Sequence, residues 1–289
     1  MTSLAQRIPR AKHSSAKDKA KELRARIDAS LDDLAQAVDE VRASETFQAY
    51  LDIQARFHKY SWHNSLLIMM QCPQASQVTG YRTWQELGRQ VRKGERGIMI
   101  FAPCPWKREK DDGDTEEGVF FKAVHVFDVA QTEGDDLPAV DVPTVEVAAD
   151  RLLADLQRVA TERGIAVTFG PIDTGAFGVS KGGSIEVDNQ HPTGQQAKTL
   201  AHELAHEALH KDKATRGDLT RAIAELEAES VAYVVSTHFG LDVQVRASRY
   251  IALWDGDSKA LRDSLERITS TARALIDDVE AVDTRKAVA

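Results

Sequence analysis

The stretch Thr199-Leu-Ala-His202-Glu203-Leu-Ala-His206 decides the fold and the chemistry of the C-terminal half of this 289-residue chain. On a helix, residues four positions apart lie one turn apart on the same face, so the imidazoles of His202 and His206 can reach one cation. Glu203 then lies beside the position that a catalytic zinc site leaves open for water. The motif therefore predicts a metal-binding helix, with Glu203 as the general base that takes a proton from that water.

A third ligand is predicted on the following helix. Glu225 comes 19 residues after His206, which is the HExxH-x18-E spacing of the gluzincin metallopeptidases. Those enzymes also carry an acid four residues after the third ligand, where it supports one metal-binding histidine, and Glu229 occupies that place on the same helical face. The expected cofactor is one divalent ion, Zn²⁺ first and Mn²⁺ or Co²⁺ as substitutes, because His₂Glu sites accept all three.

The same helix offers a second, overlapping motif. His206-Glu207-Ala-Leu-His210 repeats the HExxH pattern, and Glu229 follows His210 by the same 19 residues. His202 and His210 lie about 12 Å apart along a helix axis, so the three histidines cannot share one ion. Spacing alone therefore leaves two alternatives open, His202/His206/Glu225 and His206/His210/Glu229.

The composition is that of a folded globular protein rather than a disordered or disulfide-rich one. Hydrophobic residues make up 42% and charged residues 28% of the chain, and the net charge is −8. Cys72 and Cys104 have no recognisable pairing, no run of 18 apolar residues is present, and the N-terminus is basic and polar. The sequence therefore predicts a cytoplasmic protein that has no membrane partner.

Apolar periodicity and turn residues predict an α+β fold. The HExxH-x18-E spacing indicates that the second half is a zincin-like domain of the gluzincin type. We expect helices over 16–42, 44–60, 62–71, 81–88, 145–163, 193–211, 217–239 and 258–281. We expect strands over 77–80, 97–102, 119–129, 165–169, 177–179 and 184–187. The last of these is predicted to be an edge strand that pairs with an extended peptide substrate.

Composition also suggests where the chain divides. Residues 107–118 are expected to form a charged hairpin loop, and the proline-containing segment 138–144 a linker. The prediction is a basic flexible tail (1–15), an N-terminal domain (16–137) and a metallopeptidase domain (145–289).

Basic and aromatic residues alternate in the N-terminal half, around two glycine turns. Such a combination binds single-stranded nucleic acid, since aromatic faces stack on bases while cations follow the phosphates. The same residues also fit a basic hairpin in which Trp84 and Trp106 anchor the core. The candidates for nucleic-acid contact are Tyr81, Arg82, Trp84, Arg89, Arg92, Lys93, Arg96, Trp106, Lys107 and Arg108.

Several strings together carry a resemblance to a known family. They are Tyr60-Ser-Trp62-His-Asn64-Ser-Leu-Leu, Gln71-Cys-Pro73, Val78-Thr-Gly80-Tyr81-Arg82-Thr-Trp84, Gly88-Arg89-Gln-Val-Arg-Lys93-Gly94-Glu95-Arg-Gly97 and Val126-Phe127-Asp128-Val-Ala-Gln131-Thr132-Glu133-Gly134. With them, the chain resembles the ArdC-type antirestriction family from about residue 45 to about residue 280. The resemblance implies an N-terminal domain that binds single-stranded DNA and a C-terminal zincin-like metallopeptidase domain.

The resemblance also bears on individual residues. It adds Trp62 and Asn64 to the candidates for DNA contact. It favours the set His202, His206 and Glu225, because the family commonly has a bulky apolar residue where this chain has Glu207, which we then expect to be solvated.

The resulting expectation is a protein that binds single-stranded DNA, holds a metal ion and protects incoming mobile-element DNA from restriction. Its further partner would be an unidentified protein substrate or a component of the restriction system. One alternative is a DNA-associated metallopeptidase that cleaves repressors or DNA-crosslinked proteins, like ImmA/IrrE-type and SprT-type enzymes. Another is a non-catalytic DNA-binding protein that the metal only stabilises. Candidates for an oxyanion-stabilising group are Tyr233, His238 and Tyr250.

Overall fold

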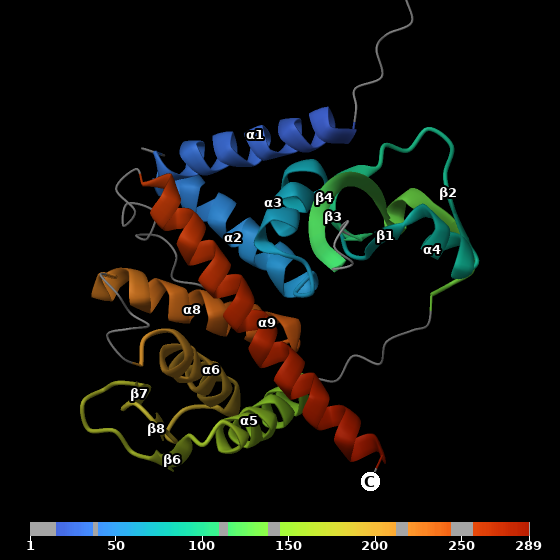
Figure 1. The fold of residues 1–289 in the computed structure, drawn as a ribbon. Helices are drawn as coiled ribbons and strands as arrows, with labels where there is room; N and C mark the ends of the chain where they lie inside the picture. Colours follow the sequence, from blue (N-terminus) through green and yellow to red (C-terminus); the bar gives the residue numbers. More distant parts are fainter. Residues whose placement is uncertain are drawn as a thin grey trace, which may run out of the picture.

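The computed structural model describes residues 16–36, 40–109, 115–137, 145–211, 219–243 and 257–288. The predicted tail (1–15), the predicted linker (138–144) and Tyr250 lie outside these ranges. The predicted α+β class is confirmed: helices and three small sheets make up the described chain (Figure 1).

The N-terminal half begins with three helices. They form because apolar residues recur along them at helical spacing, as do the buried Leu23, Ile27 and Leu31 of the first. These helices are α1 (Ala16–Ala35), α2 (Glu40–Arg56) and α3 (Trp62–Gln71). The elements that follow are β1 (Val78–Gly80), α4 (Tyr81–Glu86), β2 (Arg89–Val91), β3 (Ile98–Glu109), β4 (Thr115–Asp128), the 3₁₀ turn η1 (Val129–Gln131) and β5 (Thr132–Gly134). The predicted helices of this half were placed correctly to within a few residues, except that the first ends at Ala35 rather than at residue 42.

A long antiparallel hairpin of β3 and β4 dominates this half. The two strands pair continuously from Ile98↔Val126 to Glu109↔Thr115, whereas β1 adds only a short third strand at the base. The predicted loop over 107–118 is therefore wrong in its extent, because most of these residues continue the ladder. The strand was not predicted here because its side chains lie in solvent on both faces, so the sequence lacks the alternation of apolar and polar residues that indicates a strand. The two three-residue strands β2 and β5, which pair with each other, were also not predicted.

Two side-chain amides of α3 cover the outer edge of β3. Asn64 accepts a hydrogen bond from the backbone N–H of Phe101 and donates one to its carbonyl, both at 2.9 Å. Gln71, seven residues later on the same helical face, pairs in the same way with the backbone of Met99. The two amides thus act as a substitute strand and satisfy backbone groups that would otherwise lack partners at this buried edge.

This clamp gives a first prediction. Asn64→Ala should lower the free energy of unfolding by about 2 kcal/mol, because it leaves a backbone N–H and a C=O without partners. Urea denaturation monitored by circular dichroism measures the change. The exposed Gln74 on the loop after α3 provides the control, since Gln74→Ala should change the stability by less than about 0.5 kcal/mol. Equal losses in the two variants would contradict the clamp.

The C-terminal half packs helices around a small mixed sheet. Its elements are α5 (Val145–Glu162), β6 (Ala166–Gly170), β7 (Gly178–Ser180), β8 (Ser184–Asp188), α6 (Thr193–Leu209), α8 (Arg221–His238) and α9 (Ser258–Val288). The strand order is β6-β8-β7, with β8 parallel to β6 and antiparallel to β7. The prediction that 184–187 forms an edge strand is therefore wrong: β8 is central, and the edge strand is β7. Alternation of apolar residues located the strand but could not show its neighbours.

The helix α9 joins the two halves. It crosses the molecule diagonally and contacts α1 and α3 on one side and α5, α6 and α8 on the other (Figure 1). Buried polar contacts cross the same interface: the hydroxyl groups of Tyr50 and Thr269 lie 2.7 Å apart, and Tyr233 donates a hydrogen bond to Asp52 at 2.6 Å. The helices before and after 138–144 therefore share one hydrophobic core. None of the described helices is long and apolar enough to cross a membrane.

Candidate functional site

The two histidines of the first HExxH motif and the glutamate of the next helix converge at one point. The Nε2 atoms of His202 and His206 lie 3.1 Å apart, and each lies 3.6 Å from a carboxylate oxygen of Glu225. Four ligands around an ion at 2.0–2.1 Å would lie about 3.3 Å from one another in a tetrahedron. The donor types and the spacing of this cluster therefore fit a divalent transition-metal ion.

Glu229 lies behind His202, on the side away from Glu225. Its carboxylate is 3.5 Å from Nδ1 of His202 and accepts a hydrogen bond from Lys198 at 2.6 Å. Burial alone would lower the pKa of His202, but hydrogen bonds to Glu225 and Glu229 outweigh it and raise this pKa to about 9. Hydrogen bonds from His202 and His206 hold the pKa of Glu225 well below its usual range. The acid predicted to support a metal-binding histidine is thus in the expected place.

His206 is oriented by a chain of hydrogen bonds instead. Its Nδ1 lies 3.1 Å from Nδ1 of His210, and Nε2 of His210 lies 3.1 Å from the carboxylate of Glu227. The buried Glu227 also accepts hydrogen bonds from Ser264 and Arg267 on α9. If the carboxylate of Glu227 accepts a hydrogen bond from Nε2–H of a neutral His210, then Nδ1 of His210 carries no hydrogen and must accept a hydrogen bond from Nδ1–H of His206. A neutral His206 then has a lone pair on Nε2.

These contacts bear directly on the two alternatives for the metal-binding set. Glu229 faces His202 rather than His210, and His210 is occupied by Glu227. The structure therefore brings together His202, His206 and Glu225, and it does not bring together His206, His210 and Glu229. Helical spacing showed that His210 lies on the same face as His206, but only tertiary packing shows that His210 contacts Glu227 and orients His206.

Glu203 lies at the edge of a cleft of about 930 Å³ that contains the cluster. The cleft is bounded by β7 with the residues before it, by α6 and by the first turns of α8. Burial raises the pKa of Glu203, and the nearby His202 and His206 only partly oppose this effect. A carboxylate with this environment, beside three potential metal ligands, suits a general base.

The edge strand β7 borders the cleft closely. A Cβ atom on Gly178 would lie 2.6 Å from the side chain of Thr199 and 3.0 Å from that of Glu203, so only glycine lets the strand approach the motif helix this far. In the described sheet, the outer edge of β7 has no partner strand. An extended peptide can therefore add to β7 directly beside Glu203.

Glu207 is buried, so the prediction that it is solvated is wrong. Its carboxylate accepts hydrogen bonds from the backbone N–H groups of Gly182 and Gly183 and from the hydroxyl of Ser180, at 2.6–2.8 Å. Both glycines have positive φ angles, of 74° and 105°, which aim successive N–H groups at one carboxylate. Glu207 thus fixes the turn between β7 and β8 onto the motif helix.

Removing this carboxylate should loosen the edge of the cleft. Glu207→Ala is expected to lower the free energy of unfolding by about 2–3 kcal/mol and to speed hydrogen exchange at the amides of Gly182 and Gly183. Glu186→Ala is the matched control, because Glu186 pairs only with the half-exposed Lys181. Unchanged amide protection in the Glu207 variant would show that the turn forms without it.

The structure separates the residues that were predicted to contact DNA. Trp62 and Trp84 are each 2% exposed, and Asn64 is engaged with β3, so these three lie in the core. Arg89 and Arg92 donate hydrogen bonds to backbone carbonyls or side chains around β5 and η1. Of the two alternatives, core anchoring applies to Trp84, whose indole donates a hydrogen bond to the carbonyl of Phe127 at 2.8 Å.

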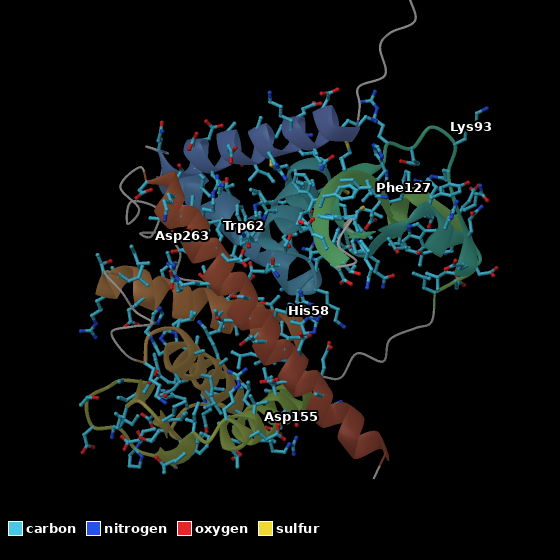
Figure 2. The ribbon with its side chains drawn as sticks, in the orientation of Figure 1. His58, Trp62, Lys93, Phe127, Asp155 and Asp263 are labelled. Carbon is cyan, nitrogen blue, oxygen red and sulfur yellow. The ribbon has the colours of Figure 1, made fainter. Side chains whose placement is uncertain are left out.

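The other candidates lie on the surface. Figure 2 shows Lys93 projecting from the loop after β2, away from the body of the protein. Lys107 is exposed and forms an ion pair with Glu117 across the hairpin. The side chain of Arg108 lies outside the described part of the chain. The candidates that the structure exposes are Tyr81, Arg82, Arg92, Lys93, Arg96, Trp106 and Lys107.

Two exposed aromatic residues on β4 were missed by sequence analysis. Phe120 and Phe121 are 53% and 51% exposed, and their neighbour Lys122 is exposed as well. Successive side chains of a strand point to opposite faces, so two adjacent phenylalanines cannot both face one core. The pair of adjacent phenylalanines could therefore have indicated from the sequence that at least one of them is exposed. The strand register places Phe120 and Lys122 on the same face as Trp106, which lies over Gly118.

Together, the fold and the site define a class of protein. A small sheet beside two helices that carry an HExxH motif and a third acidic residue is a zincin-like domain, here joined to an N-terminal hairpin domain. Residues 17–127 match the family model of the N-terminal domain of anti-restriction factor ArdC, and residues 160–237 match that of the IrrE N-terminal-like domain, a peptidase family. The chain therefore combines an ArdC-type N-terminal domain with an IrrE-type peptidase domain.

Solved structures with the same fold are known. The metal-free crystal structure of the antirestriction protein ArdC from plasmid R388 is 22% identical, with a TM-score of 0.51, and the match covers 75% of this chain and 83% of that one. The Mn(II)-bound structure of that protein matches with a TM-score of 0.48 and 21% identity, over 75% and 81% of the two chains. At 22% identity, the similarity to the metal-free structure shows only that the two proteins share a fold.

Two bacterial relatives are similar over much of the chain. An uncharacterized protein of Bacillus anthracis is 24% identical over 279 residues, which cover 79% of this chain and 47% of the relative. The uncharacterized protein y4eC of Sinorhizobium fredii is 26% identical over 215 residues, which cover 66% of each chain. The chain thus spans about half the length of the first relative and about two thirds of the second.

Proposed function

We propose that this chain is a cytoplasmic, metal-dependent peptidase that binds single-stranded DNA and protects incoming DNA from restriction. The observation that carries the proposal is the convergence of His202, His206 and Glu225 beside Glu203, in a cleft bordered by a free strand edge. The biological setting is inferred from the match of residues 17–127 to the N-terminal domain of anti-restriction factor ArdC.

The metal centre is proposed to consist of His202, His206 and Glu225, which would hold one Zn²⁺, Mn²⁺ or Co²⁺ ion. A bound ion supplies Lewis-acid chemistry, lowering the pKa of water and polarising a peptide carbonyl. Glu229 and the chain from Glu227 through His210 keep the Nε2 lone pairs of the two histidines directed at the site.

The protein's own groups would then carry the remaining chemistry. An extended peptide adding to β7 would place its backbone across Glu203. A carboxylate oxygen of Glu203 would accept the proton of the attacking water and deliver it to the leaving amine nitrogen. Because burial raises the pKa of Glu203, this carboxylate accepts the proton of the water more readily than an exposed one. Tyr233 and His238 lie at the interface with the N-terminal helices, so neither is proposed as an oxyanion-stabilising group.

Two substitutions separate metal binding from catalysis. His202→Ala should reduce the Zn²⁺ content by one ion per chain, whereas Glu203→Gln should retain that ion and lower peptide cleavage at least about 100-fold. Elemental analysis measures the metal, and cleavage of candidate restriction proteins or repressors in the presence of single-stranded DNA measures the activity. Glu186→Gln, on the exposed face of β8, is the control. If Glu203→Gln protected DNA from restriction as well as wild type, the chain would be a non-catalytic DNA-binding protein.

Metal binding should also release a proton. Since the pKa of metal-free His202 is raised to about 9, this imidazole is protonated at pH 7 and must lose its proton to become a ligand. Calorimetric titration with Zn²⁺ in buffers of different ionisation enthalpy should give about one proton released at pH 7, and fewer as the pH rises past 9. Glu229→Gln should reduce the number at pH 7, because it removes one cause of the raised pKa. A buffer-independent enthalpy would contradict this assignment.

The distal half of the hairpin is the proposed DNA contact. Trp106, Phe120 and Lys122 share one exposed face, which combines two stacking surfaces with a cation. Lys93, Arg96, Arg82 and Tyr81 add cationic and aromatic groups around α4 and the loop after β2. Because the chain is acidic overall, this local arrangement rather than the net charge must provide the attraction.

Loss of a stacking surface should weaken DNA binding. Phe120→Ala and Trp106→Ala are each expected to cost about 1–3 kcal/mol in the affinity for single-stranded oligonucleotides. Lys93→Ala should instead reduce the dependence of binding on salt concentration, since it removes one phosphate contact. Fluorescence anisotropy measures both effects. Phe177→Ala, which truncates an equally exposed aromatic residue beside β7, is the control and should leave the affinity unchanged.

A second function is favoured by the match of 160–237 to the IrrE N-terminal-like domain. In that case, the cleft would cleave a DNA-bound repressor or a DNA-crosslinked protein rather than a restriction component. Cleavage of such a substrate without any protection of DNA from restriction would favour this alternative.

A further inference from the structure

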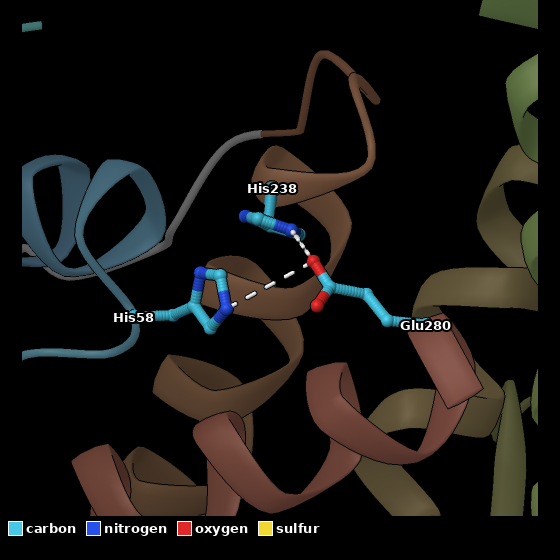
Figure 3. A group of neighbouring side chains, drawn as sticks. All are labelled: His58, His238 and Glu280. Carbon is cyan, nitrogen blue, oxygen red and sulfur yellow. Dashed lines mark ion pairs between the residues drawn. The ribbon is translucent and has the colours of Figure 1, made fainter. Parts of the chain in front are cut away.

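A second group of metal-ligating side chains lies away from the cleft. His58 comes from the turn between α2 and α3, His238 is the last residue of α8, and Glu280 belongs to α9 (Figure 3). His238 follows Glu225 by 13 positions on α8, which corresponds to about 20 Å along the helix axis. The group is therefore separate from the proposed catalytic centre, and it joins the ArdC-type N-terminal half to the peptidase half.

The potential ligand atoms already face one another. Nε2 of His238 lies 3.4 Å and Nε2 of His58 lies 3.9 Å from the same carboxylate oxygen of Glu280. All three lie within 4.8 Å of one another, so shifts of at most about 1.5 Å would give the spacing of about 3.3 Å around a tetrahedral ion. Asp277, one turn before Glu280, is 4.0 Å from Nε2 of His58 and provides a fourth potential ligand.

The tautomer of His238 is set by the backbone. Nδ1 of His238 lies 2.9 Å from the carbonyl oxygen of Ala55, and because a carbonyl only accepts, Nδ1 carries the proton. In a neutral imidazole, Nε2 then presents a lone pair to the carboxylate of Glu280. Two electron-rich atoms at 3.4 Å require a cation between them or a second proton on His238. A backbone carbonyl behind the ring is also the arrangement that orients metal-binding histidines.

His58 points to the same conclusion independently. It is 6% exposed, and neither ring nitrogen has a hydrogen-bond partner among the described residues. A buried imidazole without a partner is costly, which makes it a marker for a missing ligand.

We propose that His58, His238 and Glu280 bind a second divalent transition-metal ion. Two imidazoles and a carboxylate are ligands that Zn²⁺ prefers, and water or Asp277 completes the coordination, because Glu280 is 40% exposed. The ion fastens the turn after α2 to α8 and α9. It stabilises the contact between the DNA-binding half and the peptidase half, and it takes no part in peptide hydrolysis.

The experiment uses the full chain with the first centre removed. In the double variant His202→Ala/Glu225→Gln, calorimetric titration with Zn²⁺ alone should still give one ion per chain, together with a rise in the melting temperature. Adding Glu280→Gln should weaken this binding at least about tenfold and abolish the thermal shift. Adding His58→Asn should do the same, which covers the case that one variant fails to fold. Co²⁺ absorption in the visible range provides a second readout of imidazole ligation.

Lys59→Gln is the matched control. Its ammonium group lies 3.5 Å from the other carboxylate oxygen of Glu280, so this variant removes an ion pair but no ligand, and Zn²⁺ should bind as tightly or more tightly. If the double variant binds no Zn²⁺ while wild type binds one ion, the second site is refuted and the catalytic centre stands. Equal Zn²⁺ binding by the double variant with and without Glu280→Gln would also refute the second site. Two ions in wild type and one in the double variant would establish both.

Discussion

The rest of the structure depends on the burial of three carboxylates that α6 and α8 carry. Glu203, Glu207 and Glu227 are all buried, and a buried carboxylate is tolerated only with partners. Each therefore imposes a neighbour: the histidines for Glu203, the backbone of the β7–β8 turn for Glu207, and His210 with α9 for Glu227. The metal centre, the edge of the cleft and the position of α9 all follow from these pairings.

The helix α9 carries this constraint into the N-terminal half. On one side of α9, Arg267 and Ser264 bind Glu227. On another side of the same helix, Thr269 forms a hydrogen bond with Tyr50 of α2. Burial and the neighbouring Asp52 raise the pKa of Tyr233 to about 12, so this hydroxyl remains a hydrogen-bond donor to α2 at physiological pH. The interface between the halves is thus built from specific polar pairs as well as from apolar contact. Such pairs fix one relative arrangement, whereas apolar contact alone allows sliding.

The hairpin obeys different physics. Its base is held by the amide clamp of Asn64 and Gln71, but its distal half has side chains in solvent on both faces. Regular alternation of apolar and polar residues is weak in such a segment, so the charged residues over 107–118 were predicted to form a loop. Trp62 and Trp84 were predicted to contact DNA for a different reason. The sequence shows that a tryptophan is present, while burial depends on which distant helix or strand covers it.

Sequence alone determined what depends on local spacing. Helical periodicity placed His202, Glu203 and His206 on one face, and the next helix supplied Glu225 and Glu229, since a turn of 3.6 residues is fixed by the backbone. Tertiary structure decided what depends on pairing between distant segments: that Glu229 supports His202 and Glu227 holds His210, that β7 rather than β8 is the free edge, and that His58 meets His238 and Glu280. These contacts join residues far apart along the chain, and no spacing rule specifies which remote surfaces will be buried together.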